Sequence, residues 1–402
     1  MKNVAIINIS NYGSTGKIAS GLHNYLQSKG VNSLFCYGRG ETVNDESCYR
    51  IDSTFEIKFN SLLSRLLGDH GCHSLLPTKR LLRLFEKNTI DGVFLVNLHA
   101  DYINEDMLLQ YIAKKGLPVV YIMIDEYPFL GKCPYNSGCE RYKVGCGKCP
   151  QVKSYPFSWF FDRSRKKYNL KKSVYPLLDK SVFVAPEFVL QKAKTSPLME
   201  GKRLEIVDEA IDVVRCQPRN NAEIRRSLNI PEDKVVIVSV VPYSGIINRK
   251  GGHYLLQLAK LLEDDDRFVF VHVGFNAEKN LCPQNYIPIG FVKDQNKLPD
   301  YYSVADLFVF PSIDDTMPNA CLEALACGSP LLCFNTSGMP YVADSSCGQF
   351  VEPGNVEEMA EVIKKTQRKD AKTIEICRNY ALKRYDSRVY FERLSDLLES
   401  LY

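Results

Sequence analysis

Apolar runs alternate with amphipathic segments along most of the chain. The amphipathic segments at 17–30 and 104–116 carry apolar residues at helical spacing and end in glycine. The apolar runs are rich in Val, Ile, Leu, Phe and Tyr, which is typical of buried strands. They lie at 4–9, 32–38, 92–100 and 117–125, and again at 235–242, 267–274, 285–292, 306–312 and 329–335. This alternation predicts an α/β protein with two doubly wound parallel sheets.

The spacing of these runs also predicts the domain organisation. A chain of 402 residues exceeds what one compact core usually holds, so two domains are expected. We predict a first Rossmann-like domain at 1–205, with a less regular cysteine-rich insert at 130–175. A second Rossmann-like domain is expected at 206–384, because periodicity is lost between about 200 and 220. The amphipathic tail at 385–402 is predicted to be a helix that packs back on the first domain.

Composition narrows the class of protein. Hydrophobic residues make up 45% and charged residues 24%, as in ordinary globular chains. The net charge of +4 is too small to argue for nucleic acid as a partner. The first ten residues look like a strand rather than a signal peptide, and no apolar run approaches membrane-spanning length. With fourteen cysteines and no secretory signal, we expect a cytoplasmic protein whose thiols stay reduced or bind metal.

Two loops are expected at the carboxyl ends of strands in the second half, where ligands bind in open α/β sheets. The first, "PYSGIINRKGG" at 242–252, carries Arg249 and Lys250 before a glycine pair at a helix start. Free helix N–H groups and two cations suit a phosphate or diphosphate. A surface turn with two solvated cations is the alternative. The loop matches neither the P-loop nor the dinucleotide fingerprint, which argues against kinases and dehydrogenases.

The second loop leads into "PSIDDTMPNACLEALACGSP" at 311–330. Pro318 suits the first turn of a helix, and Gly328 suits its end. Glu323 then lies one to two turns inside an otherwise small and apolar helix, with Asp315 in the loop before it. Carboxylates accept hydrogen bonds from hydroxyls, so these two side chains could hold a ribose and a sugar ring.

These motifs resemble a known family. "RKGG", "GFV", the stretch at 306–338 and the G-x-F-V-x-P-G pattern at 348–354 are similar to the retaining glycosyltransferases of family four. In the first half, "GSTGKIA", "NLHADYIN", "YPFLGKC" and "GCGKCPQ" resemble the bacterial capsular and exopolysaccharide branch. The resemblance implies the GT-B architecture, two Rossmann-like domains across a cleft, with the donor nucleotide held mainly by the second.

The resemblance also implies roles for single residues. Arg249 and Lys250 would bind the donor diphosphate and stabilise the charge of the leaving group, and Glu323 would hold the ribose. Asp315 would contact the transferred sugar, although relatives usually have the longer glutamate there. Further donor contacts are implied for Gly13, Ser14, Thr15, Gly16, Asp125, Gly245, Met317, Pro318, Asn319, Ala320 and Cys321.

The first half departs from the family pattern. Relatives usually carry a His-Asp pair where this chain has Ile124 and Asp125. His99 either lines the cleft or is a buried structural histidine, the commoner case. Glu187 and Glu209 stand where relatives have serine and asparagine, and either would repel a diphosphate or recognise an acceptor.

The resemblance implies a UDP- or GDP-sugar as donor and no catalytic metal, because the two cations replace a magnesium ion. A separate metal is suggested by the segment "CPYNSGCERYKVGCGKC" at 133–149, whose last two cysteines have C-x-x-C spacing. Four thiolates suit structural zinc, whereas reduced thiols packed in a loop and disulfides are the alternatives. The four residues are Cys133, Cys139, Cys146 and Cys149.

Two functions follow from these observations. One is retaining, metal-independent transfer of a sugar to a glycan or polyprenyl-linked acceptor in surface polysaccharide biosynthesis. The other is a catalytically weak or inactive relative that binds nucleotide or glycan within a biosynthetic assembly, as Ile124 and Asp315 suggest. Basic and aromatic stretches at 59–87 and 157–172 are either solvated helix faces or a peripheral contact with the inner face of the cell membrane.

Overall fold

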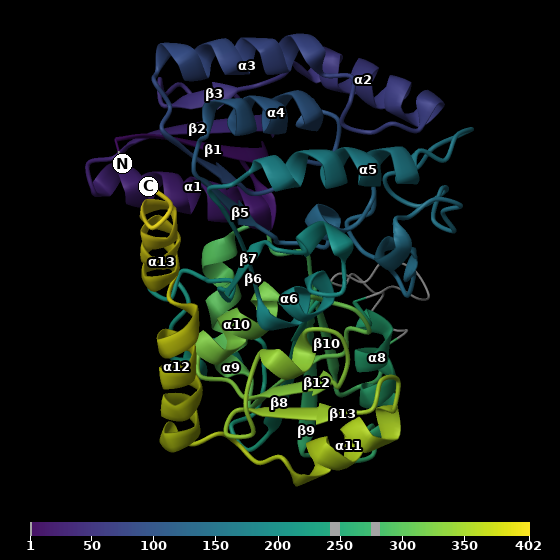
Figure 1. The fold of residues 1–402 in the computed structure, drawn as a ribbon. Helices are drawn as coiled ribbons and strands as arrows, with labels where there is room; N and C mark the ends of the chain where they lie inside the picture. Colours follow the sequence, from purple (N-terminus) through teal and green to yellow (C-terminus); the bar gives the residue numbers. More distant parts are fainter. Residues whose placement is uncertain (1, 242–249, 275–281) are drawn as a thin grey trace. The chain divides into compact units, whose positions relative to one another are not determined.

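The computed structural model describes residues 2–241, 250–274 and 282–402. The chain forms two compact units (Figure 1). The first contains residues 1–208 and 388–402, and the second contains residues 209–387. Gly245 and Arg249 lie outside the described residues.

The first unit is built on a seven-stranded sheet in which every pairing is parallel. Its strands, in spatial order, are β3 (Cys48–Arg50), β2 (Asn32–Arg39), β1 (Asn3–Ser10), β4 (Gly92–Leu95), β5 (Val119–Ile122), β6 (Ser181–Ala185) and β7 (Arg203–Ile206). The first strand, β1, therefore lies between β2 and β4. At such a point the crossovers diverge to opposite sides, which opens a crevice at the carboxyl ends of the strands.

The helices of this unit begin and end at recognisable signals. Ser53 and Glu56 form a capping box at the start of the second helix, and Asn104 caps the fourth. Gly68 and Gly116 end the same two helices in the left-handed conformation. The helices are α1 (Gly13–Ser28), α2 (Thr54–Leu67), α3 (Leu75–Lys87), α4 (Glu105–Lys115), α5 (Ser164–Val174), α6 (Glu187–Ala193) and α13 (Ser387–Glu399).

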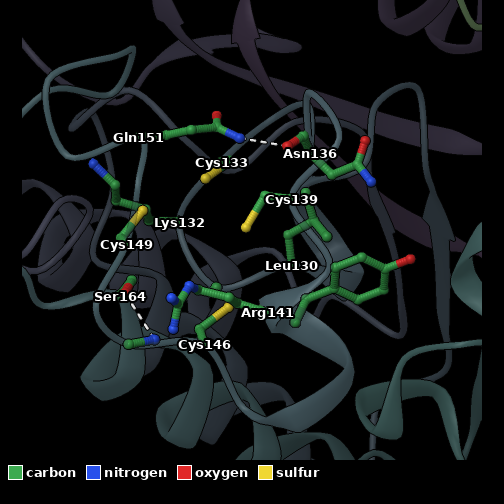
Figure 2. A pocket seen from close by; sticks show the side chains of 13 residues that line it. Leu130, Lys132, Cys133, Asn136, Cys139, Arg141, Cys146, Cys149, Gln151 and Ser164 are labelled. Atoms are coloured by element: carbon green, nitrogen blue, oxygen red, sulfur yellow. Dashed lines mark hydrogen bonds between the residues drawn. The ribbon is translucent and has the colours of Figure 1, made fainter.

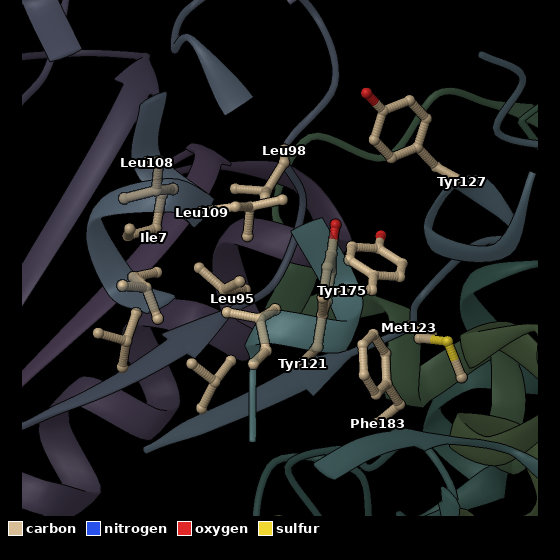
Figure 3. Packing of buried hydrophobic residues seen from close by; sticks show 14 of the residues in the cluster. Ile7, Leu95, Leu98, Leu108, Leu109, Tyr121, Met123, Tyr127, Tyr175 and Phe183 are labelled. Atoms are coloured by element: carbon tan, nitrogen blue, oxygen red, sulfur yellow. The ribbon is translucent and has the colours of Figure 1, made fainter. Parts of the chain in front are cut away.

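The core of the first unit fills the space between the sheet and its helices (Figure 3). Ile7 and Leu95, on neighbouring strands, are completely buried, as is Leu109 on α4. Towards the last strands the core becomes aromatic, and Tyr121 stacks on Phe183 with ring centroids 5.5 Å apart. The continuous apolar runs of the sequence are thus explained by strands buried on both faces.

The C-terminal helix belongs to this first unit from residue 388 onward. A side chain at Gly21 on α1 would collide with the ring of Phe391 on α13, so the two helices lie in close contact (Figure 1). The hydroxyl of Tyr402 donates to the backbone oxygen of Asp91 at 2.7 Å, and the Asp91 side chain accepts from the backbone N–H of Lys2 at 3.1 Å. Both ends of the chain therefore meet at one residue.

The second unit has a six-stranded sheet, also parallel in every pairing. Its strands, in spatial order, are β10 (Tyr286–Gly290), β9 (Phe268–Val273), β8 (Val235–Val240), β11 (Leu307–Phe310), β12 (Leu331–Phe334) and β13 (Gly348–Val351). Again the first strand, β8, lies at the point where the strand order reverses. The helices are α7 (Asn221–Ser227), α8 (Gly252–Leu261), α9 (Leu298–Val304), α10 (Asn319–Ala326), α11 (Val356–Lys365) and α12 (Ala371–Tyr385).

Two parallel-sheet α/β units confirm the predicted fold class. The sequence shows no periodic pattern around residue 205, but the structure has the strand β7 there. It is a short strand at the edge of the sheet, and its residues are exposed or half-buried, so no apolar run marks it. Among the described helices, none is long and apolar enough to cross a membrane.

Candidate functional site

Two loops meet at the carboxyl ends of β8 and β11, which are adjacent in the second sheet. Gly251, in the loop that follows β8, has a φ of +70° and precedes the first residue of α8. A side chain there would place its Cβ 1.8 Å from the backbone oxygen of Pro311. The glycine after Lys250 is therefore required both for its conformation and for the close approach of the two loops.

Lys250 and Asp315, predicted from separate motifs, form an ion pair in this place. The side chain of Asp315 is 11% exposed and that of Lys250 is 31% exposed. The Lys250 ammonium lies 5.8 Å from the ring centre of Phe310, at the end of β11. Gly338 donates its backbone N–H to the backbone oxygen of Asp315 at 2.8 Å, and a Cβ at Gly338 would collide with Thr316. The carboxylate is thus held on a tightly packed loop.

The start of α10 follows directly. Pro318 is the N-cap residue, one position before the predicted first turn, and its backbone oxygen accepts from the N–H of Cys321 at 2.9 Å. No side chain among the described residues caps this helix, and Asn319 Oδ1 is buried without a hydrogen-bond partner there. An uncapped helix start with an unsatisfied amide suits an anionic or hydroxyl-bearing ligand. The predicted donor contacts of this loop lie in or just before the first turn: Met317, Pro318, Asn319, Ala320 and Cys321.

Glu323 is buried one turn into α10 and has two partners. Arg215 donates from Nη2 to Oε1 at 2.6 Å, and the hydroxyl of Tyr302 donates to Oε2 at 2.8 Å. Burial, and then the Glu323 carboxylate, raises the pKa of Tyr302 well above its ordinary value, so this phenol remains a donor. Each carboxylate oxygen keeps a second lone pair, which leaves capacity for a ligand hydroxyl.

In the first unit, the predicted glycine-bearing loop forms the start of α1 after β1. Gly13 has a φ of +74°, and Thr15 Oγ1 accepts from the amide of Asn8 at 3.2 Å. A Cβ at Gly16 would lie 2.7 Å from the carbonyl carbon of Asn11, so this glycine allows the helix to pack on the loop before it. Ser14 is exposed in the same turn.

Asp125 lies after β5 in the same sheet, in a cluster that spans two neighbouring strands. Its Oδ2 lies 3.0 Å from Nε2 of His99, a residue that follows β4. The other ring nitrogen of His99, Nδ1, lies 3.1 Å from the hydroxyl of Tyr155. Asn97 is 6% exposed, and its Oδ1 has no partner among the described residues. His99 therefore joins Asp125 to a tyrosine on the cysteine-rich insert. Ile124 is half-buried beside this cluster.

Two buried lysines hold the loop that contains Asp125. Lys171 on α5 donates to the backbone oxygens of Tyr127 and Leu130 at 2.5 and 3.1 Å. Lys167 forms an ion pair with the fully buried Glu105 at 2.5 Å. These two cations belong to the basic stretch at 157–172, so part of that stretch is internal rather than a solvated or lipid-facing surface.

The other residues singled out from the sequence lie in both units. Cys133, Cys139, Cys146 and Cys149 line one small pocket in the first unit (Figure 2). Glu187 is the first residue of α6, and the backbone N–H of Glu209 donates to the sulfur of Met317 at 3.3 Å. Arg215, Tyr302, Asn97 and Tyr155 were not predicted. Arg215, Tyr302 and Tyr155 are single residues in segments without a recognisable motif. Asn97 opens the motif "NLHADYIN", in which His99 was the residue singled out.

Comparison with known proteins finds a family match within the second unit. Residues 220–384 match the family model described as glycosyl transferases group 1. A putative colanic acid biosynthesis glycosyl transferase, WcaC of Escherichia coli (strain K12), is 24% identical over 88% of this chain and 87% of its own length. The putative teichuronic acid biosynthesis glycosyltransferase TuaC of Bacillus subtilis (strain 168) is 28% identical over 48% of this chain and 51% of its own length.

Solved structures share the fold at low sequence identity. Sucrose-phosphate synthase from Thermosynechococcus elongatus superposes with a TM-score of 0.66 at 13% identity, covering 100% of this chain and 99% of that one. Anabaena HepE in complex with UDP-glucose gives a TM-score of 0.61 at 14% identity over 100% of both chains. The fold is thus that of the GT-B glycosyltransferases. The chain is similar to glycosyl transferases of group 1 and to bacterial polysaccharide members, the resemblance that its motifs predicted.

Proposed function

We propose that this protein transfers a sugar from a nucleotide-sugar donor to a glycan acceptor in bacterial surface polysaccharide biosynthesis. The observation that carries the proposal is the Lys250–Asp315 pair beside the uncapped start of α10. A cation, free helix N–H groups and a carboxylate at one point can bind a diphosphate and the sugar attached to it. The names of WcaC and TuaC, and the UDP-glucose bound to HepE, support this class of substrate.

In this proposal the diphosphate replaces Asp315 as the partner of Lys250. Arg249, the neighbouring cation in the sequence, would bind the same group. Their positive charge stabilises the nucleoside diphosphate as it leaves, an effect typically worth a factor of about 100 to 1000 in rate per donor. Asp315, released from Lys250, accepts hydrogen bonds from hydroxyls of the transferred sugar. Glu323 uses its remaining lone pairs for the ribose.

Two finer features belong to the same proposal. Transfer proceeds with retention at the anomeric carbon, and no catalytic metal takes part because cationic side chains neutralise the diphosphate. The donor is a UDP- or GDP-sugar. The acceptor is a glycan or a polyprenyl-linked oligosaccharide at the cytoplasmic face of the membrane.

A nucleotide-binding test with matched lysine variants examines the donor site. UDP- or GDP-sugars should raise the thermal midpoint of the wild type equally with and without EDTA, and Lys250→Ala should lose this response. Lys260→Ala is the control, because Lys260 is an exposed lysine near the other end of α8. An equal response from Lys250→Ala and Lys260→Ala would show that the proposed site is wrong.

The second part of the proposal is a membrane contact, formed mainly by exposed residues of α2. This helix buries polar residues, including Asn60 and Ser64, whereas Phe55 is 78% and Phe59 is 53% exposed. The backbone oxygen of Arg65 accepts from the N–H of Trp159 at 2.7 Å, so the loop at 157–163 lies against the end of α2. We define the α2 patch as the exposed apolar residues Phe55, Phe59, Leu62, Leu67, Trp159, Phe160 and Phe161, with the cations Lys58, Arg65 and Arg163 beside them.

Aromatic residues mixed with cations suit an anionic lipid surface. Sedimentation with phosphatidylglycerol vesicles should therefore recover the wild type and release it at high salt. Phe59→Ser with Phe160→Ser should bind several-fold less, whereas Val389→Ser, an exposed apolar residue on α13, should bind as the wild type does. Equal recovery on neutral phosphatidylcholine vesicles would contradict an electrostatic lipid contact.

A further inference from the structure

The cysteine-rich insert encloses a small pocket that the proposed transfer reaction does not use. Four cysteines from 133–149 line it, and Figure 2 shows their sulfur atoms pointing into the same space. Its volume is about 20 Å³, enough for one ion or one water molecule and too small for an organic ligand. All four thiols are free and partly buried. We infer that this pocket is a structural zinc site, with Cys133, Cys139, Cys146 and Cys149 as its ligands.

The backbone around the C-x-x-C pair has an unusual conformation, which brings both cysteines to the pocket. Residues 145–148 all have positive φ angles, which are +96°, +56°, +87° and +47° in order. Two of them, Cys146 and Lys148, are not glycine, and each left-handed residue costs about 1 kcal/mol. This turn brings Cys146 and Cys149 to one pocket. A Cβ at Gly131 would lie 2.8 Å from Cys146 Sγ, so glycine is also needed where the opposite wall approaches the thiol.

The charges lining the pocket also suit zinc. Four thiolates around Zn²⁺ form a centre with two net negative charges, and two cationic side chains, Lys132 and Arg141, line the same pocket (Figure 2). Lys132 is 4% exposed and donates to the backbone oxygen of Pro156 at 2.9 Å. On zinc binding the four thiols release their protons.

Four sulfur ligands leave no open position, so the metal would hold the insert together rather than react. Hydrogen bonds near the pocket connect it to the His99–Asp125 pair. Cys149 donates its backbone N–H to Asp162 at 2.7 Å, next to the start of α5, and Tyr155 in the same segment contacts His99. Zinc would therefore order the segment that places Tyr155 beside the His99–Asp125 pair.

No three of the four cysteine sulfurs lie within 4.8 Å of one another, so zinc binding would draw them closer together. Among the described residues, His23, Asp45 and Cys48 do offer three ligand atoms within that distance. Both ring nitrogens of His23 already have serine partners, Ser33 at 2.9 Å and Ser47 at 3.2 Å. This group needs no metal to satisfy it, and it supplies a control.

Metal analysis of protein purified without a histidine tag tests the inference. The wild type should contain one zinc per chain, and Cys146→Ser with Cys149→Ser should lose it. Cys48→Ser should retain it. Substoichiometric zinc in wild type reconstituted with zinc under reducing conditions, or zinc that is lost in Cys48→Ser and kept in the double variant, would overturn the assignment.

A second measurement needs no variant and therefore does not depend on the folding of one. Titration of the wild type with a mercurial reagent should release one zinc as four thiols react. Cobalt reconstitution should give the intense visible bands of a tetrahedral thiolate complex. Thiols that react without zinc release, or a cobalt spectrum of octahedral oxygen ligands, would contradict a four-cysteine site.

Discussion

At the scale of single residues, Glu323 carries two roles that substitution can separate. It balances the buried charge of Arg215, and in the proposed function it binds the ribose. Glu323→Gln removes both, so it should weaken nucleotide affinity about tenfold or more and lower the thermal midpoint. Arg215→Leu breaks the same ion pair but keeps the carboxylate. Calorimetric titration should show that it destabilises the protein while weakening nucleotide binding less. Equal losses of affinity would argue against a ribose contact.

Residue-level prediction could single out candidates where a motif fixed the spacing, and their roles stay predictions. Lys250 and Asp315 come from two motifs 65 positions apart, and the fold brings them into contact. It failed for Arg215 and Tyr302, because a partner that reaches a buried carboxylate from another segment leaves no local pattern. His99 shows a third case. Its sequence context favoured a structural histidine, and only the pairing of β4 with β5 reveals Asp125 as its neighbour.

At the scale of elements, His272 on β9 ties three segments together and makes their stability depend on pH. Its ring contacts the backbone oxygen of Val241 at 3.0 Å and the hydroxyl of Tyr286 at 2.5 Å. Burial lowers the pKa of His272 to about 4. Between pH 6.5 and 4 the unfolded chain therefore binds a proton that the folded chain rejects, so stability falls as pH falls through this window.

Denaturant unfolding of the wild type should consequently show a loss of about 2 kcal/mol from this histidine between pH 7 and pH 5. His272→Gln should lack that part of the loss, since glutamine does not titrate. The same pH dependence in both proteins would mean that His272 does not control it.

The elements themselves were predictable in proportion to their burial. Strands such as β1 and β8 lie inside their sheets and read as continuous apolar runs. The short edge strands β3 and β7 are half-exposed and leave no such run. The polarity of α2 also escaped a periodicity argument, because several apolar residues at helical spacing, such as Phe55, Phe59 and Leu62, face outward, whereas Ile57 packs in the core.

At the scale of the whole molecule, each unit carries its candidate residues at the carboxyl edge of a parallel sheet. In the first unit these are the start of α1 and the His99–Asp125 pair, and in the second they are Lys250, Asp315 and the start of α10. The sequence predicted this plan because parallel sheets place their loops by rule. It could not predict the partners within each loop, which depend on how distant segments pack.

The most direct test of the central claim is transfer itself. A polyprenyl-linked or soluble glycan acceptor, incubated with the UDP- or GDP-sugar that stabilises the protein, should yield a new glycosidic bond in the presence of EDTA. NMR of the product should show the anomeric configuration of the donor, and Lys250→Ala should form none. Tight nucleotide binding without transfer to any acceptor, in protein with an intact fold, would contradict the account. It would favour a nucleotide- or glycan-binding relative instead.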